Sequence, residues 1–490
     1  MRRFEQPTSM TKSPARHDDS ARSAPTLSHA LDALERSIAD ALAARSLVKI
    51  GGAVTEISSS SCRLSGLSHF VRLGECVELA GVGKTSLCEV VRIDAYGVTV
   101  KPFDGTLDAG LGTMAWACGG VTLSPDLSWK GRTLNALGKP IDGLGPLRQG
   151  ERAIPTDREP PAPMRRQRVR KPIKTGIRVV DLFTPLCAGQ RIGIFAGSGV
   201  GKSTLLSMLG RAAGFDTTVL ALVGERGREV REFLEDALGR EKARTIAVVA
   251  TGDESPMMRR LAPKAAMCIA EHLRDHGENV LLIVDSVTRY AHAARDVALS
   301  AGEPPVARGY PPSVFSDLPR LLERAGAGEE GAGSITGVFA VLVDGDDHND
   351  PVADSIRGTL DGHIVLDRAI AEQGRYPPVN VLSSVSRLTR AVLTAEQQKL
   401  MLKLREMIAQ FEDTRDLRLM GGYHSGADPG LDKAIQFVPR IYETLRQAPE
   451  DPLSGDAFQD IARALSADLP EPAGANRLTR ASPGTALRQT

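Results

Sequence analysis

The stretch from Ile192 to Leu206 limits the fold of this chain more than any other part of the sequence. Its first residues, Ile192–Phe195, form an apolar run that is typical of a buried strand. A glycine-rich segment follows, and from Leu205 onward the apolar residues begin a helical pattern. Strand, glycine-rich turn and helix, in this order, are what a phosphate-binding P-loop requires. The turn consists of Gly197, Ser198, Gly199, Val200, Gly201, Lys202, Ser203 and Thr204.

We expect these turn residues to bind the phosphates of a nucleotide. Glycines let backbone N–H groups surround a polyphosphate, and the helix N-terminus adds the positive end of its dipole. Lys202 would reach the β- and γ-phosphates, and Ser203 would offer its hydroxyl to Mg²⁺. Ala196 stands where the motif has glycine, so the entry to the loop departs from the pattern. The alternative interpretation is an ordinary glycine-rich turn between a strand and a helix.

Strands and helices alternate on both sides of the loop, from Gly176 to about Leu388. This alternation predicts an α/β core with a mostly parallel sheet covered on both faces. Ligands of such sheets bind beyond the carboxyl ends of the strands, where the P-loop falls. The predicted strands are Ile192–Phe195, Thr218–Val223, Thr245–Val249, Val280–Val284, Ser334–Val343, Gly362–Leu366 and Val379–Leu382.

Five further regions flank this core, which we bound at 124–393. Residues 1–25 are polar and basic, and we expect them, like 471–490, to be disordered. The 26–46 region reads as an amphipathic helix that packs on its own domain or docks a partner helix or a membrane surface. Short β segments separated by glycines predict a small β-barrel over 47–123. After Thr394 the pattern is helical, which predicts a C-terminal helical domain over 394–470.

The barrel region contains a second segment that imitates a P-loop, Gly81-Val82-Gly83-Lys84-Thr85. Glu78 occupies its upstream glycine position, and the residues after it, Ser86 to Ile93, read as a strand. A P-loop must open a helix, so we interpret this segment as a hairpin turn.

Composition narrows the class of protein. The chain has 61 Lys+Arg against 60 Asp+Glu, which argues against a general nucleic-acid or membrane binder. The basic segment 164–171 lacks interleaved aromatic residues, so a solvated connector is favoured over a nucleic-acid patch. The six cysteines show no metal-ligand spacing, and no apolar run reaches the roughly 20 residues of a membrane span. We expect a soluble, intracellular protein.

Three side chains are candidates for chemistry around the loop. Asp285 ends the apolar run Val280–Val284 and could hold Mg²⁺ opposite Ser203. Glu225 follows the strand that ends in Val223 and could orient and deprotonate a water, although it could equally cap the next helix. Arg387 follows the predicted strand Val379–Leu382, which would place it at the same sheet edge; a surface arginine is the alternative.

Together these segments resemble the catalytic subunits of hexameric rotary-type ATPases, and within them the flagellar protein-export ATPases. The resemblance runs from about residue 45 to 450. It is carried by 195–203, by Gly224-Glu225-Arg226-Gly227-Arg228-Glu229-Val230, by Gly309-Tyr310-Pro311-Pro312-Ser313-Val314-Phe315, by 318–326 and by Leu360-Asp361-Gly362-His363-Ile364-Val365-Leu366.

The resemblance implies a RecA-like core, ATP and Mg²⁺ as ligands, and a role for each candidate. Glu225 matches the glutamate that polarises the attacking water, and Asp285 matches the metal-binding carboxylate. Arg226 lies beside the site, Arg387 matches an arginine finger that enters the neighbouring subunit's site, and Tyr376 matches the aromatic residue that stacks on adenine. A structural tyrosine is the alternative there. Ala196 is accepted in the export branch, whereas Asn380 replaces the usual aspartate.

The resemblance also implies an assembly and a function. Because one chain holds Lys202, Glu225 and Arg387, a homohexamer would make every interface competent. We expect ATP hydrolysis that energises flagellar protein export at a membrane gate, by a cytoplasmic protein associated peripherally with the inner membrane. The implied partners are a stator-like regulator on the N-terminal helix, a central coiled-coil stalk, the export gate, and substrates with their chaperones. The alternatives are the ATPase of a virulence injectisome, a hexameric RNA helicase and an inactive regulatory subunit.

Overall fold

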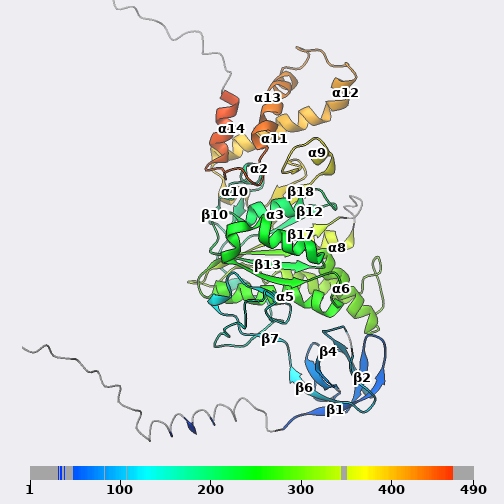
Figure 1. Ribbon diagram of the computed structural model, residues 1–490. Helices are drawn as coiled ribbons and strands as arrows, with labels where there is room; N and C mark the ends of the chain where they lie inside the picture. Colours follow the sequence, from blue (N-terminus) through cyan, green and yellow to red (C-terminus); the bar gives the residue numbers. More distant parts are fainter. Residues whose placement is uncertain are drawn as a thin grey trace, which may run out of the picture. The chain divides into compact units, whose positions relative to one another are not determined.

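The fold comes from a computed structural model, which describes residues 31, 34, 35, 38, 48–81, 83–105, 107–343 and 350–466 (Figure 1). The chain divides into two compact units, Met1–Ile50 and Gly51–Thr490. In the first, Leu31, Leu34 and Ile38 are helical and at least half exposed. The rest of the predicted 26–46 helix lies outside the described residues, as do the segments 1–25 and 471–490 that were expected to be disordered.

The second unit begins with a closed six-stranded barrel in the order β1-β2-β5-β4-β3-β6, as the sequence predicts. Alternate residues such as Val77 and Leu79 point into its interior and are buried. The first strand begins later than the predicted start of the barrel at residue 47, because residues 48–50 precede β1 and are exposed. The bounds are β1 (Gly51–Ile57), β2 (Cys62–Ser65), β3 (Cys76–Ala80), β4 (Thr85–Asp94), β5 (Gly97–Pro102) and β6 (Met114–Gly119).

The segment that imitates a P-loop connects β3 to β4, which pair as an antiparallel hairpin. Val82 lies outside the described residues. The Nζ atom of Lys84 lies 2.5 Å from Asp104 Oδ2, so this lysine is engaged in the barrel itself. The hairpin interpretation is confirmed.

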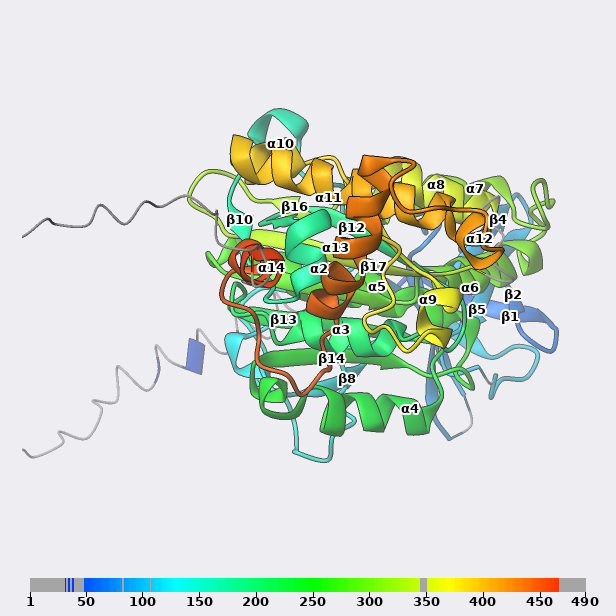
Figure 2. The same cartoon turned by 90° about the horizontal axis from the view of Figure 1, so that it is seen from above.

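A nine-stranded sheet forms the core in the order β19-β18-β12-β17-β15-β13-β14-β8, with β16 paired to β17 (Figure 2). The pairs are parallel except those of β16 and β19, which are antiparallel to their neighbours. The strands are β8 (Thr133–Asn135), β12 (Arg191–Ala196), β13 (Thr217–Val223), β14 (Thr245–Ala250), β15 (Asn279–Asp285), β16 (Gly326–Ala327), β17 (Ser334–Leu342), β18 (Gly362–Leu366) and β19 (Val385–Ser386).

Helices cover both faces of this sheet, which explains why its strands are continuous apolar runs. Alternate residues of β13 point to opposite sides: Val219 and Ala221 pack in one core with α5 and α6, whereas Leu220 and Leu222 pack in the other with α2 and α3. The helices are α2 (Arg178–Phe183), α3 (Lys202–Gly210), α4 (Gly227–Glu232), η3 (Phe233–Ala237), η4 (Gly239–Arg244), α5 (Pro256–Asp275), α6 (Val287–Ser300), α7 (Pro312–Leu322), α8 (Pro351–Thr359), α9 (Arg368–Glu372) and α10 (Thr389–Val392).

Short elements join the barrel to the core. They are β7 (Thr122–Leu123), η1 (Leu127–Trp129), β9 (Ile154–Pro155), η2 (Pro163–Arg165), β10 (Pro172–Ile173) and β11 (Leu186–Cys187). The basic segment 164–171 begins within η2 and is mostly exposed, but Arg166 is anchored through a 2.7 Å hydrogen bond from its Nη2 to Glu323 O.

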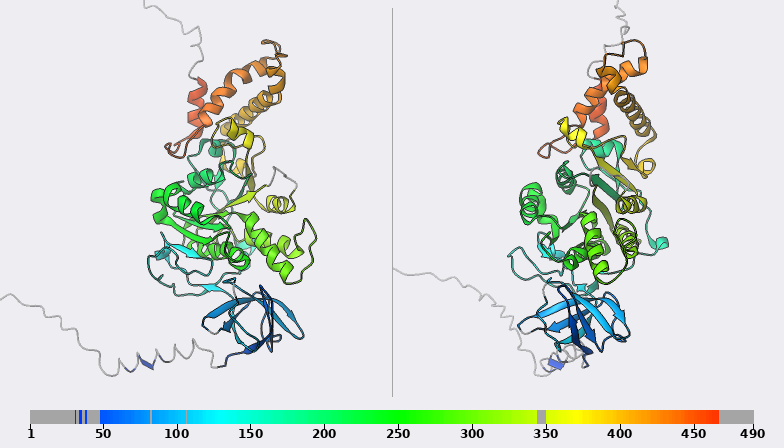
Figure 3. Two further views of the ribbon diagram at one scale, coloured as in Figure 1. Left: turned by 45° about the vertical axis from the view of Figure 1, so that its right-hand side comes forward. Right: turned by 90° about the vertical axis from the view of Figure 1, so that its right-hand side faces the viewer.

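The C-terminal region is helical, as predicted, and lies on the side of the core away from the barrel (Figure 3). Helix α11 begins with a capping box formed by Thr394 and Gln397. Its buried residues are Met401, Leu404 and Ile408, while Leu402 is 60% exposed. The helices are α11 (Ala395–Asp413), α12 (Arg415–Leu419), α13 (Pro429–Leu445) and α14 (Ala457–Ser466).

The predicted strand Val379–Leu382 is wrong. Val379 makes only an isolated bridge to Leu366, and the chain then turns. The Oδ1 atom of Asn380 accepts hydrogen bonds from the backbone N–H groups of Leu382 and Ser383, both at 3.1 Å. This Asx-type turn outweighs the β propensity of the neighbouring apolar residues.

In the described part of the chain, no helix combines the length and the apolar character that a membrane span requires. All six cysteines are free thiols, and only Cys118 is exposed.

Candidate active site

The P-loop joins the end of β12 to the start of α3 at the carboxyl edge of the parallel sheet. Gly199 and Gly201 have φ angles of 75° and 107°, which side chains with a Cβ rarely adopt, so glycine is required at both positions. Ala196 is 2% exposed and packs in the core beneath the loop. Its methyl group therefore does not obstruct the phosphate cradle, which explains why the departure from the motif is tolerated.

Lys202, Glu225 and Asp285 lie close together at the carboxyl edge of the parallel sheet. The Lys202 ammonium forms an ion pair with Asp285 and lies 3.5 Å from Glu225 Oε1. All three side chains are largely buried, with 10%, 13% and 5% of their surface exposed for Lys202, Glu225 and Asp285. The predicted meeting of these side chains follows because β12, β13 and β15 run parallel and end at the same edge.

Arg289 is a fourth charged residue of the cluster, and sequence reasoning missed it. It lies in the first turn of α6, which Ser286 caps, and its Nη1 atom is 2.7 Å from Glu225 Oε1. The signal was present in the sequence: the helix that follows Asp285 must start at the same sheet edge, so its first turn faces the loop.

The pKa values of Glu225 and Asp285 are shifted in opposite directions. Burial on its own would raise the pKa of Glu225, but Lys202 and Arg289 together hold that pKa below its ordinary value. Burial raises the pKa of Asp285 despite the opposing effect of Lys202. Glu225 is therefore a stable carboxylate at neutral pH, suited to accept a hydrogen bond from water.

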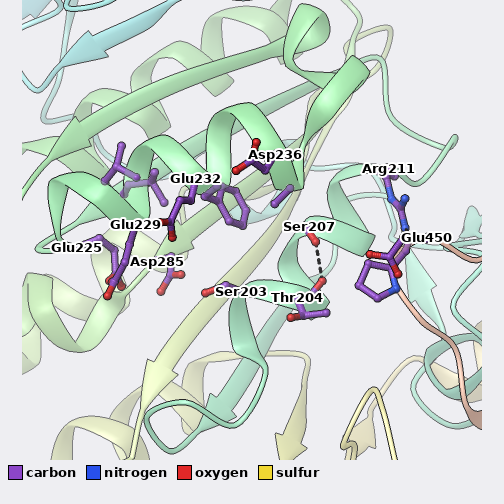
Figure 4. A pocket seen from close by; sticks show the side chains of 15 residues that line it. Ser203, Thr204, Ser207, Arg211, Glu225, Glu229, Glu232, Asp236, Asp285 and Glu450 are labelled. Atoms are coloured by element: carbon purple, nitrogen blue, oxygen red, sulfur yellow. Dashed lines mark hydrogen bonds between the residues drawn. The ribbon is translucent and has the colours of Figure 1, made fainter.

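A cavity of about 520 Å³ opens beside these residues. Ser203, Thr204 and Ser207 of α3 form one wall, and α4 with η3 forms the other (Figure 4). The oxygens of Ser203 and Asp285 both face this space, as a magnesium site at a P-loop requires. The remaining lining combines apolar residues with charged ones, and the charged ones are mostly acidic: Glu225, Glu229, Glu232, Asp236 and Glu450 with Arg211.

Arg226 lies at the start of α4 but does not turn inward. Its side chain is 84% exposed and pairs with Glu229 at 3.1 Å. Arg226 does not line the cavity, although its partner Glu229 does, and its role beside the site stays a prediction.

Tyr376 lies next to the P-loop. A Cβ atom on Gly201 would be 3.8 Å from Cε1 of Tyr376, and the ring is 45% exposed. Arg368 of α9 donates from Nη2 to Ser198 O at 3.1 Å, which ties the same region to the loop. The position allows the Tyr376 ring to stack on a base whose phosphates lie in the loop.

Arg387 is not at the edge where the sequence prediction placed it. Strand β19 is antiparallel to β18, with Ser386 opposite Gly362, so Arg387 leaves the sheet at the amino edge of the parallel strands. Its backbone N–H donates to Asp361 O at 2.9 Å. The length of β18, five residues or roughly 16 Å, separates this point from the edge that carries the P-loop.

Two family models match the chain. Residues 176–386 match the nucleotide-binding domain of the ATP synthase alpha/beta family, and residues 393–466 match the T3SS EscN ATPase C-terminal domain. The first range contains the P-loop and the residues that surround the cavity, apart from Glu450 and its neighbour Pro449.

Individual proteins are similar over most of the chain. The flagellum-specific ATP synthase of Agrobacterium fabrum is 57% identical over 415 residues, which cover 85% of this chain and 88% of that protein. The solved structure of the assembled ATPase EscN from the enteropathogenic E. coli type III secretion system superposes with a TM-score of 0.78 at 37% identity, covering 84% of this chain and 99% of EscN. The structure of EscN in complex with its central stalk EscO gives 0.77 at 38% identity, with the same coverage.

Proposed function

The chain belongs to the ATP synthase alpha/beta family, in the branch of the flagellum-specific ATP synthases, and is an ATPase; from this premise we propose that it hydrolyses ATP to energise the export of flagellar subunits by a type III apparatus. The observation that carries the proposal is the convergence of Lys202, Glu225 and Asp285 beside a cavity at the P-loop. ATP hydrolysis would serve the unfolding of subunits and their release from chaperones at the export gate.

We assign nucleotide binding to the loop residues 197–204 and to Tyr376. Lys202 would exchange its carboxylate partners for the β- and γ-phosphates, and the Tyr376 ring would stack on adenine. Ser203 and Asp285 would hold Mg²⁺ together with phosphate oxygens and water. When bound, Mg²⁺ neutralises charge that develops on the phosphates.

Glu225 is the residue that we assign to the attacking water. Lys202 and Arg289 both compensate its charge. When Lys202 turns to the phosphates, Glu225 keeps Arg289 but loses one cation, so its basicity rises as the substrate arrives. Glu225 then accepts a hydrogen bond from the water. This bond orients the water so that a lone pair of its oxygen points at the γ-phosphate.

Arg387 would complete the site of a neighbouring copy. Its backbone leaves the sheet at the edge opposite its own P-loop, so a second chain is the natural recipient of its guanidinium. Since every copy would both give and receive this residue, a closed ring of identical chains satisfies all sites. We propose a homohexamer, and the solved structures of assembled EscN support this choice.

Further partners follow by analogy with the related systems. A central stalk resembling EscO would fill the ring, and a stator-like regulator would bind the N-terminal helix, whose described apolar residues are exposed. The remaining partners are the export-gate membrane protein and substrates with their chaperones, which would place the ATPase at the cytoplasmic face of the inner membrane. We expect no specific nucleic-acid ligand.

The second candidate function is the ATPase of a virulence injectisome, because the similar solved structures belong to a type III secretion system. Deletion of the gene distinguishes the two. Loss of motility with intact virulence secretion supports flagellar export, and the reverse supports the injectisome. RNA-stimulated hydrolysis would instead favour the helicase alternative.

The test of the catalytic assignment is Glu225→Gln in the full-length protein, with turnover and ATP binding measured in parallel. We expect turnover to fall by about a hundredfold or more, since a positioned acid–base residue contributes roughly 10²–10⁴-fold. ATP binding should stay within about threefold of wild type, because the phosphates are held by the loop. Glu232→Gln, an exposed residue of the same cavity wall, is the matched control. Unchanged turnover in Glu225→Gln would overturn the assignment.

A further inference from the structure

The segment Arg375–Tyr376 is held from the C-terminal helical region at two points. The backbone N–H of Gln447, just beyond α13, donates to Tyr376 O at 2.9 Å. Gln447 is 2% exposed, and its Nε2 donates to Gly176 O at 2.9 Å, which fixes this first anchor in the core. The second anchor is a side-chain contact one residue earlier.

That second anchor is a stacking contact between Arg375 and Tyr442. The guanidinium carbon of Arg375 lies 3.8 Å from the centre of the Tyr442 ring. Tyr442 in turn donates from its hydroxyl to Glu412 Oε1 at 2.5 Å and packs edge-on against Phe411, with 6.3 Å between ring centres. The ring is therefore fixed by two residues of α11 while it holds an arginine that belongs to the nucleotide-binding domain.

Among the described residues, the pair of Arg375 and Tyr442 borders a cavity. A cavity of about 200 Å³ lies beside it, and Gln373, Arg375, Glu412, Arg415 and Tyr442 contribute to its lining. If the Tyr442 ring were removed, the guanidinium could move into the enlarged cavity. Of the two anchors from the C-terminal helical region, only the one at Gln447 would then remain, together with the 3.3 Å hydrogen bond from the Arg375 backbone N–H to Ile370 O.

We propose that Tyr442 is a positioning residue for nucleotide binding. Its ring holds Arg375 in place, and thereby keeps the adjacent Tyr376 in its position beside the P-loop. The inference rests on the proposed stacking of Tyr376 on the base. It adds that Tyr442, a residue of the C-terminal helical region, influences the affinity of the site for the base although it does not line the cavity at the P-loop. The phosphate cradle is independent of this contact, since residues 197–204 are built from β12 and α3.

Removal of the Tyr442 ring should weaken binding of the base without weakening binding of the phosphates. In Tyr442→Ala, the KM and the Kd for ATP should rise about three- to tenfold, the range expected for losing a partly buried cation–π contact. The kcat should stay at the wild-type value, because Glu225 and Lys202 are unaffected. Binding of inorganic tripolyphosphate, which has no base to stack, should not change. Tyr442→Phe keeps the ring and should bind ATP as wild type does.

Arg375→Met tests the contact from its other side. It should raise the Kd for ATP as Tyr442→Ala does, and the double variant should be no worse than either single variant, since both remove the same contact. Tyr423→Ala is the matched control: its hydroxyl bonds to Asp432 in the same helical region, without contact to Arg375 in the described structure. It should leave ATP affinity unchanged.

The outcomes separate this inference from the proposed function. If Tyr376→Ala does not weaken ATP binding, the stacking role of Tyr376 itself is wrong. If Tyr376→Ala weakens ATP binding but Tyr442→Ala does not, only the inference fails. Equal weakening of ATP and tripolyphosphate in Tyr442→Ala, or additive effects of Tyr442→Ala and Arg375→Met, would also overturn it.

Discussion

Lys202 of the P-loop and Glu225 at the end of β13 lie 3.5 Å apart, with the Lys202 ammonium also paired to Asp285. Lys202, which we assign to the phosphates, thus contacts both carboxylates that we assign to the chemistry. If Lys202 turns to the phosphates of ATP, Glu225 loses one of its two cations and keeps Arg289. Under the proposed mechanism, the basicity of Glu225 therefore depends on whether ATP is bound.

The first prediction concerns Arg289. In Arg289→Gln, Glu225 loses a cation that lowers its pKa, so that pKa rises. Because the carboxylate is the active form, the acid limb of the profile of kcat/KM against pH should move to higher pH. Arg231→Gln, which removes an exposed pair on α4 and η3, should not shift the profile. An unshifted acid limb in Arg289→Gln would show that Arg289 does not control the protonation of Glu225.

The second prediction concerns Ala196. Its side chain packs in the core below the loop, so Ala196→Gly should leave ATP hydrolysis within about twofold of wild type. The free energy of unfolding should fall by about 1 kcal/mol, since glycine in a strand costs backbone entropy. Denaturant titration and steady-state turnover check the two parts. A large change in turnover would show that the entry position takes part in phosphate binding.

The third prediction concerns Asn380, whose role the sequence left open. Its Nδ2 donates to Asp367 Oδ2 at 3.0 Å, while its Oδ1 holds the following turn. Asn380→Asp keeps the turn acceptor but places a second carboxylate next to that of Asp367. The repulsion should lower the free energy of unfolding by about 1–2 kcal/mol at neutral pH. The loss should shrink as the pH falls toward about 4 and a carboxyl takes up a proton. Adding Asp367→Asn should restore stability; no restoration would exclude the pairwise contact as the cause.

The fourth prediction concerns Arg324, which lies in a segment that carries the family resemblance. Arg324 is fully enclosed, with bonds of 2.9 Å to each oxygen of Glu271 and a 2.7 Å bond to Thr156 O. Its role is structural, so Arg324→Met should destabilise the fold by about 3–5 kcal/mol, because the Glu271 charge stays buried without this partner. The double variant with Glu271→Met should recover most of that loss. Thermal unfolding of both variants measures this.

The sequence predicted the parts of the site that depend on local order along the chain. The P-loop, Glu225 and Asp285 each follow an apolar strand directly, and parallel strands end at one edge, so their meeting needed no further information. Arg289 was missed although the same reasoning reaches it.

Pairings between distant segments were not predictable in this way. Strand β8 lies in a turn-rich passage, and only its partner β14, more than a hundred residues later, makes it a strand. The direction of β19 decides at which edge Arg387 emerges, and that direction depends on a turn held by the Asn380 side chain. Local pattern favours a strand there, whereas side-chain hydrogen bonding determines the outcome.

In the proposed ring, Arg387 of a neighbouring copy completes each site, and this can be tested by mixing two inactive variants. Arg387→Ala keeps its own P-loop and Glu225, whereas Glu225→Gln keeps Arg387. In rings assembled from equal amounts of both, roughly a quarter of the interfaces should combine an intact Glu225 with an intact Arg387. We predict that the mixture recovers ATP hydrolysis to roughly that fraction of the wild-type rate. A mixture that assembles into rings but stays as inactive as the separate variants would show that Arg387 does not complete the site of a neighbouring copy.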